Sequence, residues 1–274
     1  MGIYGPPYAV DGPAPSPPLI TLLSSIEVID EPGPEWGNGL QIRPYGKGPA
    51  RTYDPCSTSP GVLTSSPFAD VDQFGAVMVY LQHECTTRGA TFAEERDRLL
   101  TTFTSVEAAQ VENQVWSGGN SVGHALVDAG ATPLNASAAT APGVALALLE
   151  QAIATSGRRG RIHATPRVVS QWSQSHALVS RPGRLETMLG TIVVPGYGYA
   201  GTAPAGMTAV SGLEAYAIAT GLMQARRELT PTVIGADDAE SVNRSNNTRI
   251  ISAQRLYAVT WDSSLRAAVR VSLS

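Results

Sequence analysis

The sequence is poor in charged residues. Asp, Glu, Lys and Arg make up 15% of its 274 residues, against about 25% in typical soluble domains, so small and uncharged polar groups must cover much of the surface. A surface of this kind suits a protein that contacts other subunits over large areas. The formal net charge of −4 argues against tight binding of nucleic acid, because neutralising phosphates requires clustered cations.

Cysteine and long apolar segments are also scarce. Cys56 and Cys85 are the only cysteines, and two thiols without CxxC spacing predict neither a disulfide framework nor a zinc site. The N-terminus lacks a basic segment followed by an apolar run, and no uninterrupted apolar stretch approaches the roughly 18 residues of a membrane span. We therefore expect reduced thiols in a cytoplasmic product that does not cross a membrane.

Ligand-binding patterns are equally few. The acidic stretches ADVD and GADDAE lack the ligand spacing and the glycine of a calcium loop, and we interpret them as solvated turns. The one basic cluster, Arg158, Arg159 and Arg161 in GRRGR, is interpreted as a solvated loop after a helix rather than a nucleic-acid contact. We expect no metal and no cofactor.

Proline, in contrast, is concentrated at the start of the chain. Twelve of the 20 prolines lie in the first 60 residues, so this segment is predicted to be non-helical and unable to fold on itself. We expect an arm that lies on a neighbouring subunit, the alternative being an arm packed across its own domain. Residues 36–55 are predicted to form a projecting β-hairpin with Gly46, Lys47 and Gly48 at its tip.

Three helices are predicted in the middle of the chain. The first begins with a capping box, TFAE at Thr91–Glu94, and runs to about Trp116, where SGG ends it. The second spans about Pro142 to Ser156 and ends at Gly157, and a short third one follows Thr165.

Apolar spacing predicts which sides of the two longer helices are buried. In the first helix the buried stripe is predicted to comprise Leu99, Leu100, Phe103, Val106 and Val111, with Glu95, Arg98, Glu107 and Glu112 on other faces. In the second helix it is predicted to comprise Val144, Leu148, Leu149 and Ile153.

Strands dominate from Thr191 onward. The last strand, LRAAVRVSL at 265–273, alternates apolar and polar residues and is predicted to be a half-buried antiparallel strand. A run of helices followed by a run of strands predicts an α+β fold.

Two apparent catalytic motifs lack the structural context that their chemistry needs. GNSVGH, 119–124, matches the nucleophile elbow of serine hydrolases around Ser121, but a helix precedes it where a strand is required. GYGYAG, 196–201, follows a strand, but proline and glycine stand where a dinucleotide-binding helix should begin. We interpret the latter as a flexible loop whose Tyr197 and Tyr199 contact neighbouring subunits.

Four sequence segments, and the order in which they occur, resemble the sequences of one protein family. They are GRIHATPRVVSQW (160–172), LGTIVVPGYGYAG (189–201), YAIATGLMQARRE (216–228) and NNTRIISAQRLYAVTWDSSLRAAVRVSL (246–273). Together with the arm, the hairpin and the long helix, they resemble the major capsid proteins of tailed bacteriophages, which have the Hong Kong 97-like fold. The likeness spans about residues 75–274 and is weaker before them. The excess of arginine over lysine suits a phage of a high-GC actinobacterial host.

The resemblance implies a domain organisation. Residues 1–30 would be the N-terminal arm and 31–73 the extended loop. Residues 74–117, with the long spine helix, would belong to the peripheral domain, 118–235 would form the axial domain, and 236–274 would return to the peripheral domain.

The resemblance also implies a function without catalysis. Many copies would assemble as hexamers and pentamers into an icosahedral head around double-stranded DNA, bound without sequence specificity, in a virion assembled in the host cytoplasm. Portal, scaffolding or cement proteins are further expected partners. An encapsulin-like compartment shell is the alternative, and a serine hydrolase using Ser121 is the alternative from a different class.

Two sets of site residues follow from the resemblance. Some relatives join subunits covalently through a loop lysine and an asparagine, and Lys47 matches the donor's place, with Asn243, Asn246 or Asn247 as the acceptor. Tyr197 and Tyr199 would lie on an axial-domain loop at the centre of the capsomer.

Overall fold

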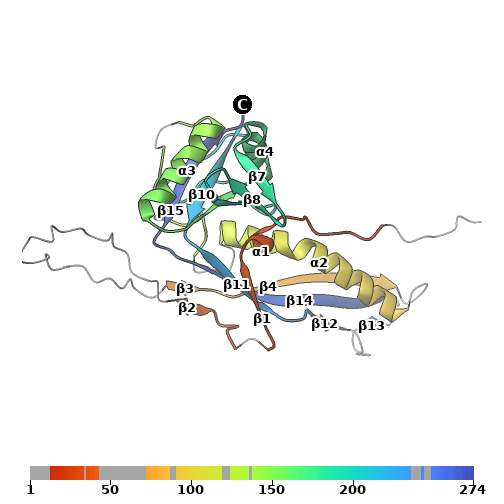
Figure 1. The fold of residues 1–274 in the computed structure, drawn as a ribbon. Coiled ribbons are helices and arrows are strands. Elements are labelled where there is room, and N and C mark those ends of the chain that lie inside the picture. Colours follow the sequence, from red (N-terminus) through yellow and green to blue (C-terminus); the bar gives the residue numbers. More distant parts are fainter. Residues whose placement is uncertain are drawn as a thin grey trace, which may run out of the picture.

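The computed structural model describes residues 13–33, 35–42, 72–86, 91–118, 124–135, 138–235, 242–243 and 248–274. Two large sheets build the molecule (Figure 1). A long helix, α2, lies along the first sheet, and two shorter helices, α3 and α4, pack against the second. The α+β class expected from the sequence is confirmed.

The first sheet is organised around its longest strand, β14 (Thr248–Trp261). The strand order is β1-β11-β14-β12, and β4 and β13 also pair with β14. The bounds are β1 Glu27–Glu31, β4 Val77–Thr86, β11 Met223–Glu228, β12 Thr232–Ile234 and β13 Val242–Asn243. β4 pairs with β14 over ten residues, from Val77 opposite Tyr257 to Thr86 opposite Thr248.

A small two-stranded sheet closes the base of the predicted extended loop. β2 (Leu40–Ile42) pairs antiparallel with β3 (Asp72–Phe74). The strand at 40–42 therefore finds its partner 30 residues further on. The predicted pairing across the Gly-Lys-Gly tip lies outside the described residues.

The spine helix α2 (Phe92–Ser117) has the predicted ends. Thr91 and Glu94 form both hydrogen bonds of a capping box, and Gly118 ends the helix with a φ of 84°, which glycine adopts at little cost. Leu99, Phe103 and Val111 are buried as predicted, but Val106 is exposed.

The positions of two acidic residues on α2 correct the prediction. Glu107 and Glu112 are buried, because α2 is covered on one side by β4 and β14 and on another by the N-terminal segment and the loop after β9. The periodicity of apolar residues identifies only the first of these contacts.

The second sheet has the order β5-β15-β10-β6-β9-β8-β7. The bounds are β5 Thr132–Pro133, β6 Arg161–Ala164, β7 Leu178–Arg181, β8 Arg184–Thr187, β9 Ile192–Pro195, β10 Glu214–Thr220 and β15 Arg266–Ser272. α3 (Pro142–Ser156) and α4 (Pro166–Gln174) cover one face. Val144 of α3, predicted to be buried, is 54% exposed.

Alternate residues of the central strand β10 face two separate cores. Ala215, Ala217 and Ala219 pack with α3 and α4, whereas Tyr216 and Ile218 belong to the core that includes α2 and the first sheet. Small residues on the first face allow the helices to approach closely. Because both faces of this sheet are covered, the strand is nearly continuously apolar.

Residues 21–31 correct the prediction for the N-terminal segment. A four-residue helix, α1 (Leu22–Ser25), is capped by Thr21, and β1 pairs parallel with β11 of the same chain. Leu22 is completely buried. The segment was predicted to be non-helical because of its prolines, but none occurs between Leu19 and Glu31. At these residues the arm packs across its own domain, which was the alternative reading.

Two crossovers join the sheets side by side. β10 continues into β11 through Gly221, and β14 continues into β15 through Asp262. Gly221 N–H donates to the Leu265 carbonyl at 3.3 Å, and Asp262 N–H donates to the Leu222 carbonyl at 3.1 Å. A Cβ at Gly221 would lie 2.7 Å from the Asp262 Cβ, so only glycine allows the two connections to touch.

Candidate functional site

The structure concentrates its buried polar contacts where the spine helix meets the N-terminal segment and the second sheet. Glu112 of α2 is fully buried. Its carboxylate accepts hydrogen bonds from the Leu22 N–H at 2.7 Å and from the Gly198 N–H at 2.9 Å. Burial raises the pKa of the Glu112 carboxyl above its usual value, while these N–H donors oppose the rise. One side chain thus holds together three segments that are distant in sequence.

The loop after β9 approaches the spine helix closely enough to require glycine. A Cβ at Gly198 would lie 1.9 Å from the Ala109 carbonyl oxygen and 2.7 Å from the Asn113 nitrogen, both backbone atoms of α2. A Cβ at Gly196 would lie 2.2 Å from the ring of Tyr199. Gly198 therefore allows close packing against a helix and Gly196 close packing against Tyr199, and neither observation points to phosphate binding.

His163 is enclosed beneath this loop. Its Nδ1 lies 3.0 Å from the Tyr199 hydroxyl and its Nε2 3.0 Å from the Thr220 hydroxyl. The Thr220 hydroxyl donates its proton to the Gly221 carbonyl and can only accept from the imidazole. His163 is therefore neutral with its proton on Nε2, and its Nδ1 accepts from Tyr199. Complete burial lowers the pKa of His163 to about 3, and the Arg161 charge adds to this effect.

Arg161 links the second sheet to the N-terminal segment. Its side chain, at the start of β6, is buried and donates to the carbonyl of Ser25, the last residue of α1. Arg158 pairs with Asp262 at the crossover at 2.7 Å. The GRRGR cluster, predicted to be a solvated loop, is therefore partly buried, and of its three arginines only Arg159 is exposed.

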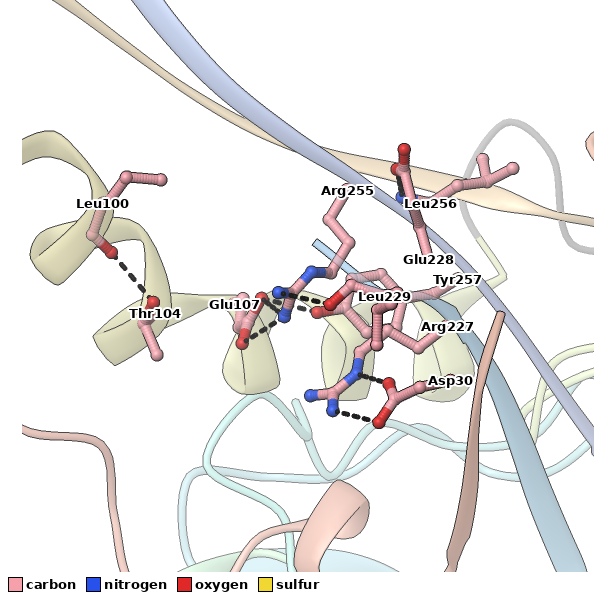
Figure 2. A network of polar contacts seen from close by, with 10 residues as sticks. All are labelled: Asp30, Leu100, Thr104, Glu107, Arg227, Glu228, Leu229, Arg255, Leu256 and Tyr257. Atoms are coloured by element: carbon pink, nitrogen blue, oxygen red, sulfur yellow. Dashed lines mark hydrogen bonds and ion pairs between the residues drawn. The ribbon is translucent and has the colours of Figure 1, made fainter. Parts of the chain in front are cut away.

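A second network, drawn in Figure 2, fixes the spine helix on the first sheet. The buried Glu107 carboxylate accepts from the Arg255 guanidinium at 3.1 and 3.2 Å and from the Tyr257 hydroxyl at 2.5 Å. Burial, followed by the Glu107 charge, raises the pKa of Tyr257. Arg255 and Tyr257 are two residues apart on β14, so their side chains lie on the same face of the strand.

An ion pair holds β1 beside this network. The Arg227 guanidinium of β11 donates to both carboxylate oxygens of Asp30, at 2.7 and 3.1 Å. This hydrogen bonding lowers the pKa of Asp30 and raises that of Arg227. The bidentate contact complements the parallel pairing of β1 with β11.

Large apolar side chains remain exposed on both halves of the molecule. On the first sheet they lie on the face opposite α2: Met78, Tyr80, Ile234 and Ile250. On the second half they include Met188, Leu189, Tyr197 and Leu222. Their spread over several elements suits contact with several neighbours rather than a single ligand pocket.

Neither a metal-binding cluster nor a membrane-spanning helix is found among the described residues. No group of three or more His, Cys, Asp or Glu side chains in these parts of the chain could bind an ion. None of the helices in the same parts is long and apolar enough to cross a bilayer. Ser121 of the GNSVGH stretch lies outside the described residues, and His124, the last residue of that stretch, packs against Phe74.

The predicted contact residues have different outcomes. Tyr197 is 53% exposed, and its contact with a neighbour stays a prediction. Tyr199 does not fit that role, because it is 5% exposed and packs on Trp116, with ring centroids 5.0 Å apart. Lys47, Asn246 and Asn247 lie outside the described residues, as does the side chain of Asn243, so the crosslink between them stays a prediction.

Sequence reasoning missed Glu107, Glu112 and His163. An acidic residue within a helix normally indicates a solvated face, and a single histidine carries no pattern. One signal in the sequence could have indicated the buried site: the glycines at 196 and 198 beside two tyrosines. This composition is compatible with close packing as well as with a mobile loop.

Solved structures show which fold this arrangement is. The capsid of a native GTA particle has a TM-score of 0.59 at 10% identity, covering 98% of this chain and 96% of that chain. A structure from Gordonia phage Cozz has a TM-score of 0.54 at 12% identity, covering 98% and 91%. The chain has the Hong Kong 97-like fold.

The Hong Kong 97-like fold of this chain is shared with a compartment protein. The holo-SrpI encapsulin complex from Synechococcus elongatus has a TM-score of 0.56 at 10% identity, covering 97% of this chain and 94% of that chain. No protein-family model and no curated protein matches the sequence. At these identities the likeness is one of fold, which the sequence resemblance predicted correctly.

Proposed function

We propose that this chain is the major capsid protein of a tailed bacteriophage. Many copies, arranged as hexamers and pentamers, would form the icosahedral head around double-stranded DNA. The observation that carries the proposal is the match to the GTA capsid over 98% of this chain and 96% of the other, which includes the spine helix, both sheets and the N-terminal segment.

Physical features of the chain support a shell. Exposed apolar side chains are distributed over both halves of the molecule, and charge is sparse. A segment that buries little surface alone gains stability against neighbours, so assembly and folding are linked by mass action. The net charge of −4 would let DNA move along the inner wall instead of adhering to it.

The proposal assigns a structural role to each segment of the chain. Residues 1–30 would form the arm, 31–73 the extended loop, 74–117 and 236–274 the peripheral domain, and 118–235 the axial domain. DNA would be enclosed without sequence-specific contacts, and portal, scaffolding or cement proteins would complete a virion assembled in the host cytoplasm.

An encapsulin-like shell is the second candidate, favoured by the match to the holo-SrpI encapsulin complex. The two differ in their contents. Particles from the native source that contain double-stranded DNA support the phage head, whereas a co-purifying cargo protein without DNA would favour the compartment.

We assign the chain no catalytic role. The test is turnover of a generic ester, with Ser121→Ala as the matched variant. Activity that this substitution abolishes would replace the structural reading with that of a serine hydrolase.

The first experiment is sedimentation and negative-stain microscopy of the chain expressed alone. Closed shells of uniform diameter support the proposal and would mean that no scaffold is required. If only small species form, co-expression with the neighbouring structural genes of its source is the second arm, and failure of shells there as well would contradict the proposal.

A covalent crosslink between subunits is a further prediction of the resemblance. Shells in which Lys47 is joined to Asn243, Asn246 or Asn247 of a neighbour would give a ladder of multimers on a denaturing gel. Lys47→Arg, which keeps the charge but removes the amine nucleophile, should reduce this ladder to monomer. Wild-type shells that give only monomer would refute the crosslink without affecting the shell assignment.

A further inference from the structure

A cavity of about 490 Å³ lies beside the crossover between the two sheets. Its lining carries four arginines and one glutamate: Arg158, Arg159, Arg161, Arg184 and Glu186. Arg158 is paired with Asp262, and Arg184 with Glu186 at 2.7 Å. Positive charge thus exceeds negative charge at this place, although the chain as a whole is acidic.

Arg161 supplies the deepest positive charge of the cavity. Only 9% of the residue is exposed, and its Nε has no hydrogen-bond partner within the described structure. A buried unsatisfied guanidinium nitrogen is costly. Burial, and secondarily the nearby Arg184 charge, lowers the pKa of Arg161. No ion pair is found for Arg159 or Arg161 in the described parts of the chain, so an anion entering the cavity would compensate both.

The rim of the cavity is apolar. Leu189 is 79% exposed and Leu222 54% exposed, and both line the same cavity. A phosphate backbone would leave these two side chains in water, whereas an acidic residue carried by a protein segment could cover them. Leucine beside arginine is therefore a better match for a polypeptide than for nucleic acid.

We propose that this cavity receives a carboxylate side chain of a second copy of the chain, with Arg159, Arg161 and Arg184 as its anion-binding residues. The inference rests on the proposed function, which brings many copies into contact. Charge complementarity identifies the occupant, because each copy carries 23 acidic residues against 19 basic ones while this cavity has the opposite excess. Leu189 and Leu222 would be covered by apolar atoms of the same incoming segment.

The test exploits the scarcity of lysine. In Arg159→Lys combined with Lys47→Arg, the new amine is the only lysine of the chain. A carbodiimide, which joins amines to carboxylates within contact distance, is added to shells assembled from equal amounts of ¹⁵N-labelled and unlabelled chains. We expect a crosslinked peptide between position 159 and an Asp or Glu, half of it of mixed isotope composition. Crosslinks of a single isotope type only, or none at position 159, would overturn the proposal.

A matched pair of variants tests the energetic contribution. Arg159→Gln combined with Arg184→Gln should raise the protein concentration needed for assembly at least tenfold. Arg181→Gln removes a charge that also pairs with Glu186, at 3.5 Å, but does not line the cavity, and should change that concentration less than twofold. Thermal unfolding of the unassembled variants checks that each one folds.

The experiments also distinguish a cavity that binds nucleic acid from a failure of the proposed function itself. If the double variant assembles like wild type but its shells lose nucleic acid, measured as the 260/280 nm absorbance ratio, the cavity binds phosphate and the proposal is wrong. If wild-type chains form no shells even with the neighbouring genes, the proposed function itself fails. Assembled shells of the Arg159→Lys, Lys47→Arg variant that lack the crosslink at position 159 refute only the assignment of the cavity.

Discussion

At the scale of single residues, the structure depends on positions that no sequence pattern marks as important. Gly198 and His163 show this clearly: the first lets a loop touch the backbone of α2, and the second is a neutral hydrogen-bonding group in the core. Gly198 joins the loop after β9 to the spine helix, whereas His163 joins that loop, at Tyr199, to Thr220 of β10. Each residue gives a prediction of its own.

Substituting Gly198 by alanine should destabilise the subunit severely. The added Cβ would lie 1.9 Å from the Ala109 carbonyl oxygen, and neither backbone can move without separating the Gly198 N–H from Glu112. We expect a loss of about 3 kcal/mol or more in the free energy of unfolding, measured by denaturant titration. Gly212→Ala, where a Cβ meets nothing within 4 Å, is the control and should change stability by less than about 0.5 kcal/mol.

Acid should destabilise the subunit through His163. In the unfolded chain a histidine titrates near its ordinary value of about 6.5, whereas burial holds the folded pKa at about 3. The unfolded chain therefore binds the proton first, and stability falls as the pH drops from 6.5 towards 3. Between pH 7 and pH 5 the loss should be about 2 kcal/mol.

Two measurements check this acid effect. Unfolding titrations of His163→Gln at both pH values should lack this part of the pH dependence. In the wild type, ¹⁵N chemical shifts of the imidazole should report a neutral ring with its proton on Nε2 at pH 5. A ring that titrates near 6.5 in the folded protein would contradict the buried assignment.

At the scale of elements, the spine helix is held by two carboxylates that point to different partners. Glu107 fixes α2 on β14 of the first sheet, and Glu112 fixes it to α1 and to the loop after β9. One helix thereby connects the N-terminal segment and both sheets. A short segment such as 21–31 becomes ordered by these contacts rather than by its own propensity.

The buried pair Glu107–Arg255 should be strongly coupled. Arg255→Met leaves the Glu107 carboxylate buried, with Tyr257 as its remaining hydrogen-bond partner among the described residues. We expect a loss of about 3–5 kcal/mol in the free energy of unfolding. With Glu107→Gln added, the loss should be smaller than the sum of the two single substitutions, by about 1–3 kcal/mol in a double-mutant cycle.

The pair Asp30–Arg227 provides the comparison for this cycle. Its side chains are 36% and 26% exposed, against 7% and 10% for Glu107 and Arg255. Arg227→Met should therefore cost no more than about 1 kcal/mol. Equal losses for Arg227→Met and Arg255→Met would show that burial does not govern the strength of these contacts.

At the scale of the whole molecule, we expect the exposed apolar groups to contribute to the proposed assembly and not to the stability of the subunit. Tyr197 is the clearest case, because its neighbour Tyr199 is inside the core whereas its own ring is 53% exposed. Tyrosine in such a place provides apolar area and a polar group with little loss of side-chain entropy.

Tyr197→Ser should weaken assembly while leaving the subunit intact. Removing one aromatic contact costs about 1 kcal/mol or more at an interface, and each hexamer would contain six copies of it. We expect the assembly threshold, measured by sedimentation, to rise at least fivefold, with an unchanged unfolding midpoint of the unassembled chain. An unchanged threshold would exclude Tyr197 from the contacts between subunits.

Local structure was largely predictable from the sequence alone. The capping box of Thr91 and Glu94, the left-handed glycines at 118 and 157, and the alternation along 265–273 all act over a few residues, so their residues identify the ends of α2, the end of α3 and the inward face of β15. The order of these elements, compared with a known family, was enough to predict the fold.

Which polar side chains are buried was determined by the tertiary structure alone. Glu107, Glu112, Arg161 and His163 are buried because partners distant in the chain, at Arg255, Leu22, Ser25 and Tyr199, satisfy their hydrogen-bonding groups. Burial of a polar side chain depends on such partners, and no local pattern encodes them. For the same reason the proline-rich start gave no sign of α1, which is stable because Leu22 and the Glu112 carboxylate meet there.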